Sequence, residues 1–546
     1  MEPLRSSQTF FQQPDTQRVI QRIAASRDLV IFVGAGVTVD QTGITLEGLV
    51  TALLERKSVP VRKEIILKTQ TRESAASIAA ELYVTSHGGQ WKEQLANDLR
   101  SNLYEKDTWE AGPLAMNLVR LAGNIAQRGG RVRFVTTNYD THLEEMIVAY
   151  NDSIRDRPND QLGSRILLID EEFAPTGPGS GTGPGTGRGD KPKEIEITYL
   201  HGRIDRTRGS DGGLVLREAD YFATAADKVD ARLLELLTQT EESVTLIVGS
   251  GLTDPPLLRA LAKTARAGGP VPMDVSEQKR FAVYPLQYID TSTLDTLMID
   301  ELKRAMELRM RQFDTRLIIP NFYFQVAQFL EELITCSALG SAPSVRSAMR
   351  YVGDGSQIRY NVRLLDWWTK WSSRWLRQIP AAQTVAQPAL QNVVEKLSET
   401  YSFYDECIRL ELWVRWDPAQ SARELRLWAQ STGTQLDIRT LRAAELDGNS
   451  HYTSVRAFCD GRPRLEDRSR REKTLPSSSD KWKTVLAVPV SYDHEYGLLP
   501  VGVVTLMSQT ERSKSRLSAL DVFELRAVVE LLREVGRDLV DPASSR

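Results

Sequence analysis

The stretch Leu29-Val30-Ile31-Phe32-Val33-Gly34-Ala35-Gly36-Val37-Thr38 decides the fold of the N-terminal half. Its five leading apolar residues predict a buried strand, and the glycines directly after them predict a sharp turn. A strand that ends on Gly-x-Gly is typical of nucleotide-binding sheets, in which a Cβ at Gly34 or Gly36 would obstruct a pyrophosphate. Alone this is a weak signal, because tight turns also use glycine for steric reasons.

Further short apolar runs follow along the N-terminal half. Each is followed by a turn or a glycine and most lead into a helix-like segment, which predicts an α/β fold with a doubly wound, Rossmann-like parallel sheet. We expect a helical insertion at about 46–127 and a flexible Gly/Pro-rich loop at 175–193, between two strands. The other predicted strands are Val132–Thr136, Ile195–Leu200, Val244–Val248, Phe281–Tyr284 and Thr315–Ile319.

Polar residues follow two of these strands, at the sheet edge where open α/β sheets bind ligands. In Thr136-Thr137-Asn138-Tyr139-Asp140, Asp140 suits a helix cap, whereas the amide of Asn138 suits holding a ribose hydroxyl or a water. In Tyr199-Leu200-His201-Gly202, the position of His201 at a strand end favours proton transfer over packing.

A fourth turn, Val248-Gly249-Ser250-Gly251-Leu252-Thr253-Asp254, follows another predicted strand. Asp254 is a natural N-cap for a helix with Pro255 at its first position. Each of the four motifs is weak when taken singly. Together, at the carboxyl ends of successive strands, they predict a ligand site along one edge of the sheet.

The order GAGVT, TTNYD, LHG, LREADY and VGSGLTD resembles the sirtuin-like domains of bacterial NAD-consuming, anti-phage defence proteins. The resemblance extends over nearly the whole N-terminal half and includes residues 43–49 and the closing segment 315–333. Two departures are Thr38, where Ser is usual, and Leu46, where Trp is common. Neither removes a group that the chemistry needs, because Thr38 keeps its hydroxyl.

The resemblance implies that NAD is the substrate. Asn138 would hold the nicotinamide-side ribose and position a water, and His201 would act as general base; both are candidate catalytic residues. Loss of nicotinamide leaves an oxocarbenium-like ribose, so the protein supplies chiefly orientation, electrostatics and one base. The residues implied to bind NAD are Gly34, Ala35, Gly36, Thr38 and Asp140, with Gly249, Ser250 and Asp254 along the adenosine half.

Protein-deacylating sirtuins carry a zinc module of four cysteines, and this chain has three, namely Cys336, Cys407 and Cys459, far apart in sequence. We therefore expect no metal and expect the ribosyl chemistry to end on water, giving nicotinamide and ADP-ribose. The alternatives are a non-catalytic NAD or ADP-ribose sensor, an NAD-dependent protein deacylase, and an interaction scaffold.

We predict a catalytic domain at 1–337, then a linker and Trp-rich helix at 338–384. Leu364, Trp368, Trp371 and Trp375 are spaced to share one helical face, which favours packing against another domain or subunit over a base-stacking platform. Residues 385–546 read as a second α/β domain and resemble a GAF sensor domain. Its expected strands are Ile408–Val414, Leu425–Ala429, Val485–Val490 and Val501–Leu506, before a helix at Ala519–Leu539.

The composition is that of an ordinary globular protein, 41% hydrophobic and 26% charged. With 69 Lys and Arg against 72 Asp and Glu, we expect no nucleic-acid partner. The absence of a signal peptide and of an apolar run near ~18 residues predicts a cytoplasmic protein that does not span a membrane. We expect a homo-oligomer whose C-terminal domain controls the catalytic domain in response to an unidentified ligand or protein.

Overall fold

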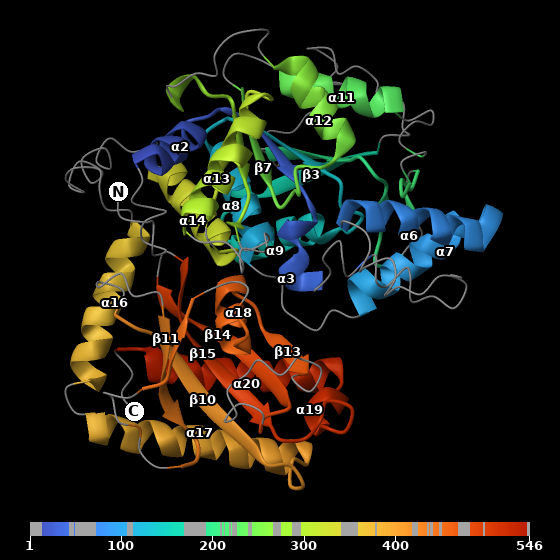
Figure 1. The fold of residues 1–546 in the computed structure, drawn as a ribbon. Coiled ribbons are helices and arrows are strands. Elements are labelled where there is room, and N and C mark those ends of the chain that lie inside the picture. Colours follow the sequence, from blue (N-terminus) through green and yellow to red (C-terminus); the bar gives the residue numbers. More distant parts are fainter. Residues whose placement is uncertain are drawn as a thin grey trace.

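The structure is a computed structural model of the 546-residue chain. The N-terminal and C-terminal halves each form around a sheet of their own, and the two halves lie against each other (Figure 1). The residues that the structure describes are 14–42, 49, 72–105, 113–168, 193–207, 210–211, 213–217, 220, 226–238, 243–265, 275–286, 296–320, 322–339, 359–376, 379–417, 424–433, 436, 441–446, 450–467, 481–494 and 497–542.

A seven-stranded sheet organises the N-terminal half, in the order β3-β4-β2-β1-β7-β8-β9. Every pairing in it is parallel, as the sequence predicts. The chain passes from β1 outward on one side and later returns to add strands on the other, so the switch point of the sheet lies between β1 and β7. The strands are β1 (Asp28–Val33), β2 (Arg131–Thr136), β3 (Leu162–Leu168), β4 (Lys193–Tyr199), β7 (Ser243–Val248), β8 (Arg280–Val283) and β9 (Arg316–Ile318).

All six predicted strands of this half are confirmed, and β3 is the strand expected before the Gly/Pro-rich loop. That loop, at 175–193, lies mostly outside the described residues, as do residues 43–48.

Helices cover both faces of this sheet because its strands are apolar on both sides. Along β1, Leu29, Ile31 and Val33 contribute to one core, and Val30 and Phe32 to the other. The first core is covered by α2 (Pro14–Ala24), α8 (Pro113–Gln127), α9 (His142–Ser153) and α14 (Phe324–Leu339). The second core is covered by α11 (Ala226–Thr238), α12 (Pro255–Thr264) and α13 (Thr296–Arg311).

The expected insertion is helical wherever the structure describes it. Helices α6 (Arg72–His87) and α7 (Trp91–Arg100) project from the body beside the sheet edge (Figure 1), and α7 continues into a π-helical turn at Ser101–Glu105. They form a small core with Ile204, from the segment after β4. Helix α8, the last part of 46–127, instead packs on the main sheet against α14 and α9.

The C-terminal half is built on a six-stranded sheet, in the order β12-β11-β10-β15-β14-β13, whose pairings are antiparallel. The strands are β10 (Ile408–Arg415), β11 (Glu424–Gln430), β12 (Ala443–Glu445), β13 (Arg464–Asp467), β14 (Thr484–His494) and β15 (Gly497–Ser508). The four predicted strands are confirmed; β12 and β13 were not predicted, because strands of three and four residues carry too little periodicity.

Helix α18 (Thr453–Asp460) covers one face of this second sheet, and α17 (Ile379–Tyr401) and α20 (Val522–Val540) cover the other. The predicted C-terminal helix is therefore confirmed as α20. Its N-terminus carries a capping box, in which Asp521 and Glu524 each accept a backbone N–H from the other. In Figure 1, α16 and α17 border this sheet on two sides, and α18 faces the N-terminal half.

The Trp-rich segment forms α16 (Arg359–Trp375), which packs against the C-terminal half. The indoles of Trp367 and Trp371 are fully buried and donate hydrogen bonds to the carbonyls of Val540 (2.9 Å) and Leu539 (3.1 Å). This confirms packing against another domain. Of the predicted face, Leu364, Trp371 and Trp375 are buried, and Trp368 is half-buried and packs against the same core. The prediction left out Trp367, which is also fully buried.

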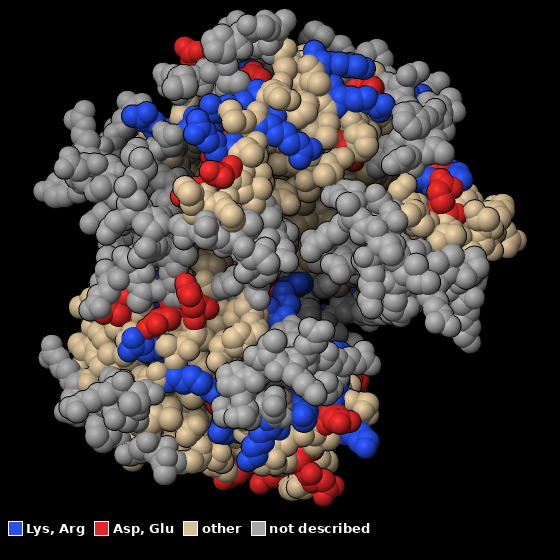
Figure 2. All heavy atoms as spheres, viewed as in Figure 1, with Lys and Arg blue, Asp and Glu red and all other residues tan. Residues whose placement is uncertain are grey.

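Among the described residues, no helix is both long enough and apolar enough to cross a membrane. On the visible face of the C-terminal half, acidic and basic side chains are interspersed (Figure 2), in keeping with the near-neutral composition.

Candidate functional site

The register of the sheet aligns the ends of the four strands that precede the predicted motifs. Val33 pairs with Thr136 of β2 on one side and with Val248 of β7 on the other, and Thr136 pairs with Tyr199 of β4. The carboxyl ends of β4, β2, β1 and β7 are therefore aligned. The predicted site residues that follow within two positions of this level are Gly34, Ala35, Asn138, His201, Gly249 and Ser250.

The turns after β1 and β7 are packed directly on each other. The N–H of Gly34 donates to the carbonyl of Val248 (3.0 Å), and the N–H of Gly36 donates to that of Gly249 (2.9 Å). A Cβ on Gly34 would lie 2.4 Å from the carbonyl oxygen of Gly249, and one on Gly36 would lie 2.8 Å from its Cα. In the structure these glycines allow the two turns to contact each other, whereas the sequence predicted that they leave room for a pyrophosphate.

Three predicted site residues form a buried hydrogen-bonded group beside this contact. The Thr38 hydroxyl donates to Oδ2 of Asp140 (3.0 Å), and Nδ2 of Asn138 lies 3.3 Å from both Thr38 Oγ1 and the Gly34 carbonyl oxygen. All three side chains belong to buried residues. Because Nδ2 of Asn138 makes these contacts, the orientation of its amide is fixed within the protein.

Asp140 precedes Thr141, which is the N-cap of α9, so the predicted cap was one residue early, although the Asp140 side chain does contact the start of the helix. Its Oδ1 accepts the N–H of His142 at 3.2 Å, the first residue of α9. The remaining oxygen, Oδ2, accepts from Thr38. Asp140 therefore ties the start of α9 to the turn after β1.

His201 lies at the end of β4 and is 9% exposed. Its Nε2 lies 3.5 Å from Oδ2 of Asp254, in the turn after β7. The other oxygen of Asp254 accepts the N–H of Leu257 at 2.9 Å, which confirms the predicted N-cap of α12. Asp254, which the resemblance places along the adenosine half, thus also lies beside the candidate base. Sequence reasoning did not pair these two residues.

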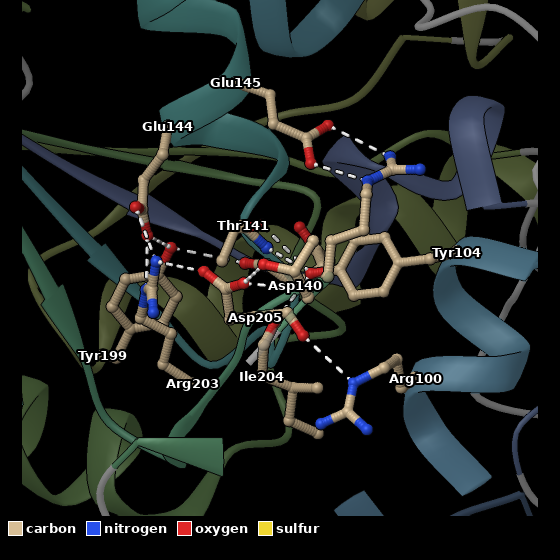
Figure 3. A network of polar contacts seen from close by, with 12 residues as sticks. Arg100, Tyr104, Asp140, Thr141, Glu144, Glu145, Tyr199, Arg203, Ile204 and Asp205 are labelled. Carbon is tan, nitrogen blue, oxygen red and sulfur yellow. Dashed lines mark hydrogen bonds and ion pairs between the residues drawn. The ribbon is translucent and has the colours of Figure 1, made fainter. Parts of the chain in front are cut away.

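A network of polar contacts surrounds the first residues of α9 (Figure 3). The Tyr104 hydroxyl, on the π-helical turn, accepts the N–H of Thr141 (2.9 Å) and donates to the carbonyl of Ile204 (2.7 Å). Burial raises the pKa of Tyr104, and the nearby Asp140 carboxylate raises it further, so the phenol stays neutral. One hydroxyl therefore joins the insertion, the segment after β2 and the segment after β4.

A second part of the same network holds β4 against α9. Arg203 binds Glu144 through two hydrogen bonds of 2.7 and 2.9 Å, and Tyr199 donates to Glu144 at 2.7 Å. The hydrogen bond to Glu144 raises the pKa of Arg203, while burial, reinforced by that carboxylate, raises the pKa of Tyr199. Tyr104, Glu144 and Arg203 were not predicted as site residues, since no local motif marks partners that lie 37 or more positions apart in sequence.

Among the described residues, no group of three or more His, Cys, Asp or Glu is arranged to hold a metal ion. Cys336, Cys407 and Cys459 are all free thiols. Ser250, the remaining predicted residue of the fourth motif, accepts the N–H of Leu252 on its hydroxyl at 3.2 Å and so shapes the turn after β7.

In a comparison with known protein families, residues 132–300 match the SIR2-like domain. This range contains three of the four strand-end motifs. The match supports a sirtuin-like family for this part of the chain. SIR2-like domains are typically NAD-utilising enzymes, so the match is consistent with an NAD-related activity.

No curated protein matches the chain. Among solved structures, the chain is similar to the type II free methionine-R-sulfoxide reductase from Thermoplasma acidophilum, at 16% identity and a TM-score of 0.21, over 30% of this chain and 98% of that one. The corresponding enzyme from Neisseria meningitidis, in complex with its substrate, is 17% identical with a TM-score of 0.19, over 30% and 92%. The reduced form of fRMsr of Staphylococcus aureus is 12% identical with a TM-score of 0.18, over 28% and 94%. These TM-scores are too low to assign a shared fold.

Proposed function

We propose that the N-terminal half is an NAD glycohydrolase, which cleaves NAD to nicotinamide and ADP-ribose. The observation that carries the proposal is the alignment, at one sheet edge, of a fixed amide (Asn138) with an imidazole (His201) from the neighbouring strand. The SIR2-like domain supports NAD as the molecule acted on.

Each residue has a role that its chemistry suits. Cleavage breaks the bond between the ribose C1′ and the nicotinamide nitrogen, and the electron pair leaves with nicotinamide. Water then forms a bond to C1′ and releases one proton. Oδ1 of Asn138 would accept a hydrogen bond from that water or from a ribose hydroxyl, because Nδ2 is anchored within the protein. His201 would accept the proton.

We favour hydrolysis over deacylation because the chain has too few cysteines for the zinc module of protein-deacylating sirtuins. Its three cysteines do not supply the four-cysteine zinc module that helps support an acyl-lysine peptide in protein-deacylating sirtuins. Without a second substrate to accept the ribosyl group, water is the acceptor. The main product would then be free ADP-ribose, and not its cyclic form or a deacylated peptide.

The C-terminal half is proposed to be a GAF-like domain that regulates this activity. An unregulated NAD hydrolase would exhaust the NAD of its own cell, so the catalytic part needs a control that responds to a signal. We place the chain among cytoplasmic defence effectors of the abortive-infection type, active as a homo-oligomer; this part of the proposal rests on the family resemblance. The signal would be a ligand or protein that the C-terminal half detects.

A non-catalytic NAD or ADP-ribose sensor is the second candidate. The same buried group around Thr38 and Asn138 would bind the nucleotide in either case. His201 favours the enzyme, since a molecule that only binds nucleotide does not need a base next to the bound ribose.

The test is NAD consumption by the purified full chain, followed as nicotinamide and ADP-ribose, beside Asn138→Ala and His201→Ala. Turnover that both substitutions abolish supports the hydrolase. Bound NAD without turnover, under every condition that changes the assembly of the chain, supports the sensor. Deacetylated peptide or cyclic ADP-ribose as the main product would overturn the proposed reaction.

A further inference from the structure

Three successive aromatic residues, Phe322, Tyr323 and Phe324, lie where the chain leaves β9 and enters α14. Phe322 and Phe324 stack on each other with ring centroids 5.7 Å apart, and both belong to the core of the C-terminal half, under α18. Phe324 meets Phe458 of α18 edge-on, at 5.4 Å. Two side chains of the N-terminal half are thus buried in the other half.

Tyr323, which lies between these two residues in the sequence, contacts the N-terminal half instead. Tyr323 is 4% exposed, and its hydroxyl donates a hydrogen bond to the carbonyl of Gly36, in the turn after β1. The same short segment therefore contacts both the C-terminal core and the candidate NAD site.

Arg462, two residues beyond the end of α18, makes a second contact, with the first residue of the short helix α3 (Val39–Thr42) that follows this turn. Nη1 of Arg462 donates to the carbonyl of Val39 at 2.7 Å, and its side chain is 17% exposed. Nε of Arg462 lies 3.7 Å from Oδ2 of Asp460, which orients the guanidinium. Gly461 lies between them, close enough to Phe324 that a Cβ would lie 3.2 Å from the Phe324 Cβ.

The two carbonyls that accept these hydrogen bonds belong to Gly36 and Val39, and Val37 and Thr38 lie between them in the sequence. Thr38 in turn holds the side chains of Asn138 and Asp140. A displacement of α18 would be transmitted through rigid aromatic packing and a charge-assisted hydrogen bond to the residues proposed to bind NAD.

We propose that α18, through Arg462 and the Phe322-Tyr323-Phe324 segment, is the element by which the C-terminal half controls the NAD site. This inference rests on the proposed function and names the route of its regulation. In the arrangement described, both contacts hold the turn after β1 in place. A signal that shifts α18 would release the turn and weaken NAD binding, and by reciprocity bound NAD would stabilise the contact of α18 with the turn.

The test compares full-length Arg462→Ala and Tyr323→Phe with the wild type by hydrogen exchange and by calorimetric titration of NAD. A matched control is Arg426→Ala, which removes an arginine of the same half that pairs with Glu424 within that half. The amides of Val37, Thr38 and Thr42, which donate to carbonyls within the turn, report on it directly. Arg462→Lys, which keeps the charge, replaces Arg462→Ala if that variant does not fold.

The proposal expects faster exchange of residues 37–42 in both test variants and not in Arg426→Ala. It also expects NAD to bind about tenfold more weakly, equivalent to about 1.4 kcal/mol. Exchange rates equal to those of the wild type in folded Arg462→Ala and Tyr323→Phe would overturn it. If no protein binds NAD, the proposed function fails, yet the exchange rates still decide whether α18 controls the turn.

Discussion

Nε2 of His201 and Oδ2 of Asp254 lie 3.5 Å apart, although the two residues follow different strands, β4 and β7, that are not neighbours in the sheet. Asp254 serves two purposes in this position, because its other oxygen caps α12. Substitutions can separate the two roles.

Asp254→Asn should keep the cap and lose the charge, because asparagine caps a helix about as well as aspartate. We expect an unchanged melting temperature and a lower kcat for NAD, since the imidazole loses its anionic neighbour. Asp254→Ala should lose about 1 kcal/mol of stability as well. If Asp254 instead contacts only the adenosine half, Asp254→Asn will raise KM and leave kcat unchanged.

Thr38→Val should disrupt the group around Asn138, because it removes the hydroxyl that donates to Asp140 and lies 3.3 Å from Asn138 Nδ2. We expect kcat/KM for NAD to fall about tenfold, the equivalent of about 1.4 kcal/mol of transition-state stabilisation. Thr38→Ser keeps the hydroxyl and is the control that should retain activity. Equal activity of the two variants would show that the hydroxyl is not needed.

Gly249→Ala should destabilise the N-terminal half. Gly249 has φ +70°, and a Cβ there would lie 2.6 Å from the backbone nitrogen of Val37. The left-handed conformation alone costs about 1–2 kcal/mol for a residue with a side chain, and the contact adds to that cost. Gly251→Ala, where a Cβ would lie 3.4 Å from Thr253 Oγ1, is the matched control. Thermal unfolding of the two variants gives the comparison; similar melting temperatures would contradict it.

Tyr104→Phe should leave the buried N–H of Thr141 and the carbonyl of Ile204 without this partner, at a cost of about 1–3 kcal/mol. Because the ring remains, packing of the insertion is kept. We expect lower stability in urea unfolding together with weaker NAD binding, since Thr141 follows Asp140. A stability equal to that of the wild type would mean that solvent replaces the phenol.

Stability should fall on acidification partly through Glu145. Burial alone would raise the pKa of this carboxyl, but its hydrogen bonds with His142 and Arg206 lower it below its ordinary value. A carboxyl with a lowered pKa stabilises the fold fully above its ordinary pKa and loses that contribution as the pH falls through the folded-state value. Glu145→Gln should therefore melt below the wild type at pH 7, with the difference shrinking towards acid. A difference that does not change with pH would exclude this role.

The strands of the N-terminal sheet could be predicted because short apolar runs and the turn residues after them mark each strand in the sequence. Each run such as Leu29–Val33 is apolar on both faces, which only a strand buried on both sides explains, and the glycine after it marks the end. The Trp-rich helix shows the limit of such patterns. Its spacing indicated a packed face, but that Trp367 is fully buried while Trp368 is only half-buried depended on the tertiary packing of the helix.

The sequence alone determined that Gly34, Asn138 and His201 follow strands of one parallel sheet, because hydrophobic periodicity and turn residues are local properties. It also determined that Asp254 begins a helix. Only the tertiary structure decided that Asp254 approaches His201 and that Arg462 reaches Val39, 423 positions away in sequence. Such contacts depend on strand order and on how the two halves of the chain pack, and no periodicity along the chain encodes either.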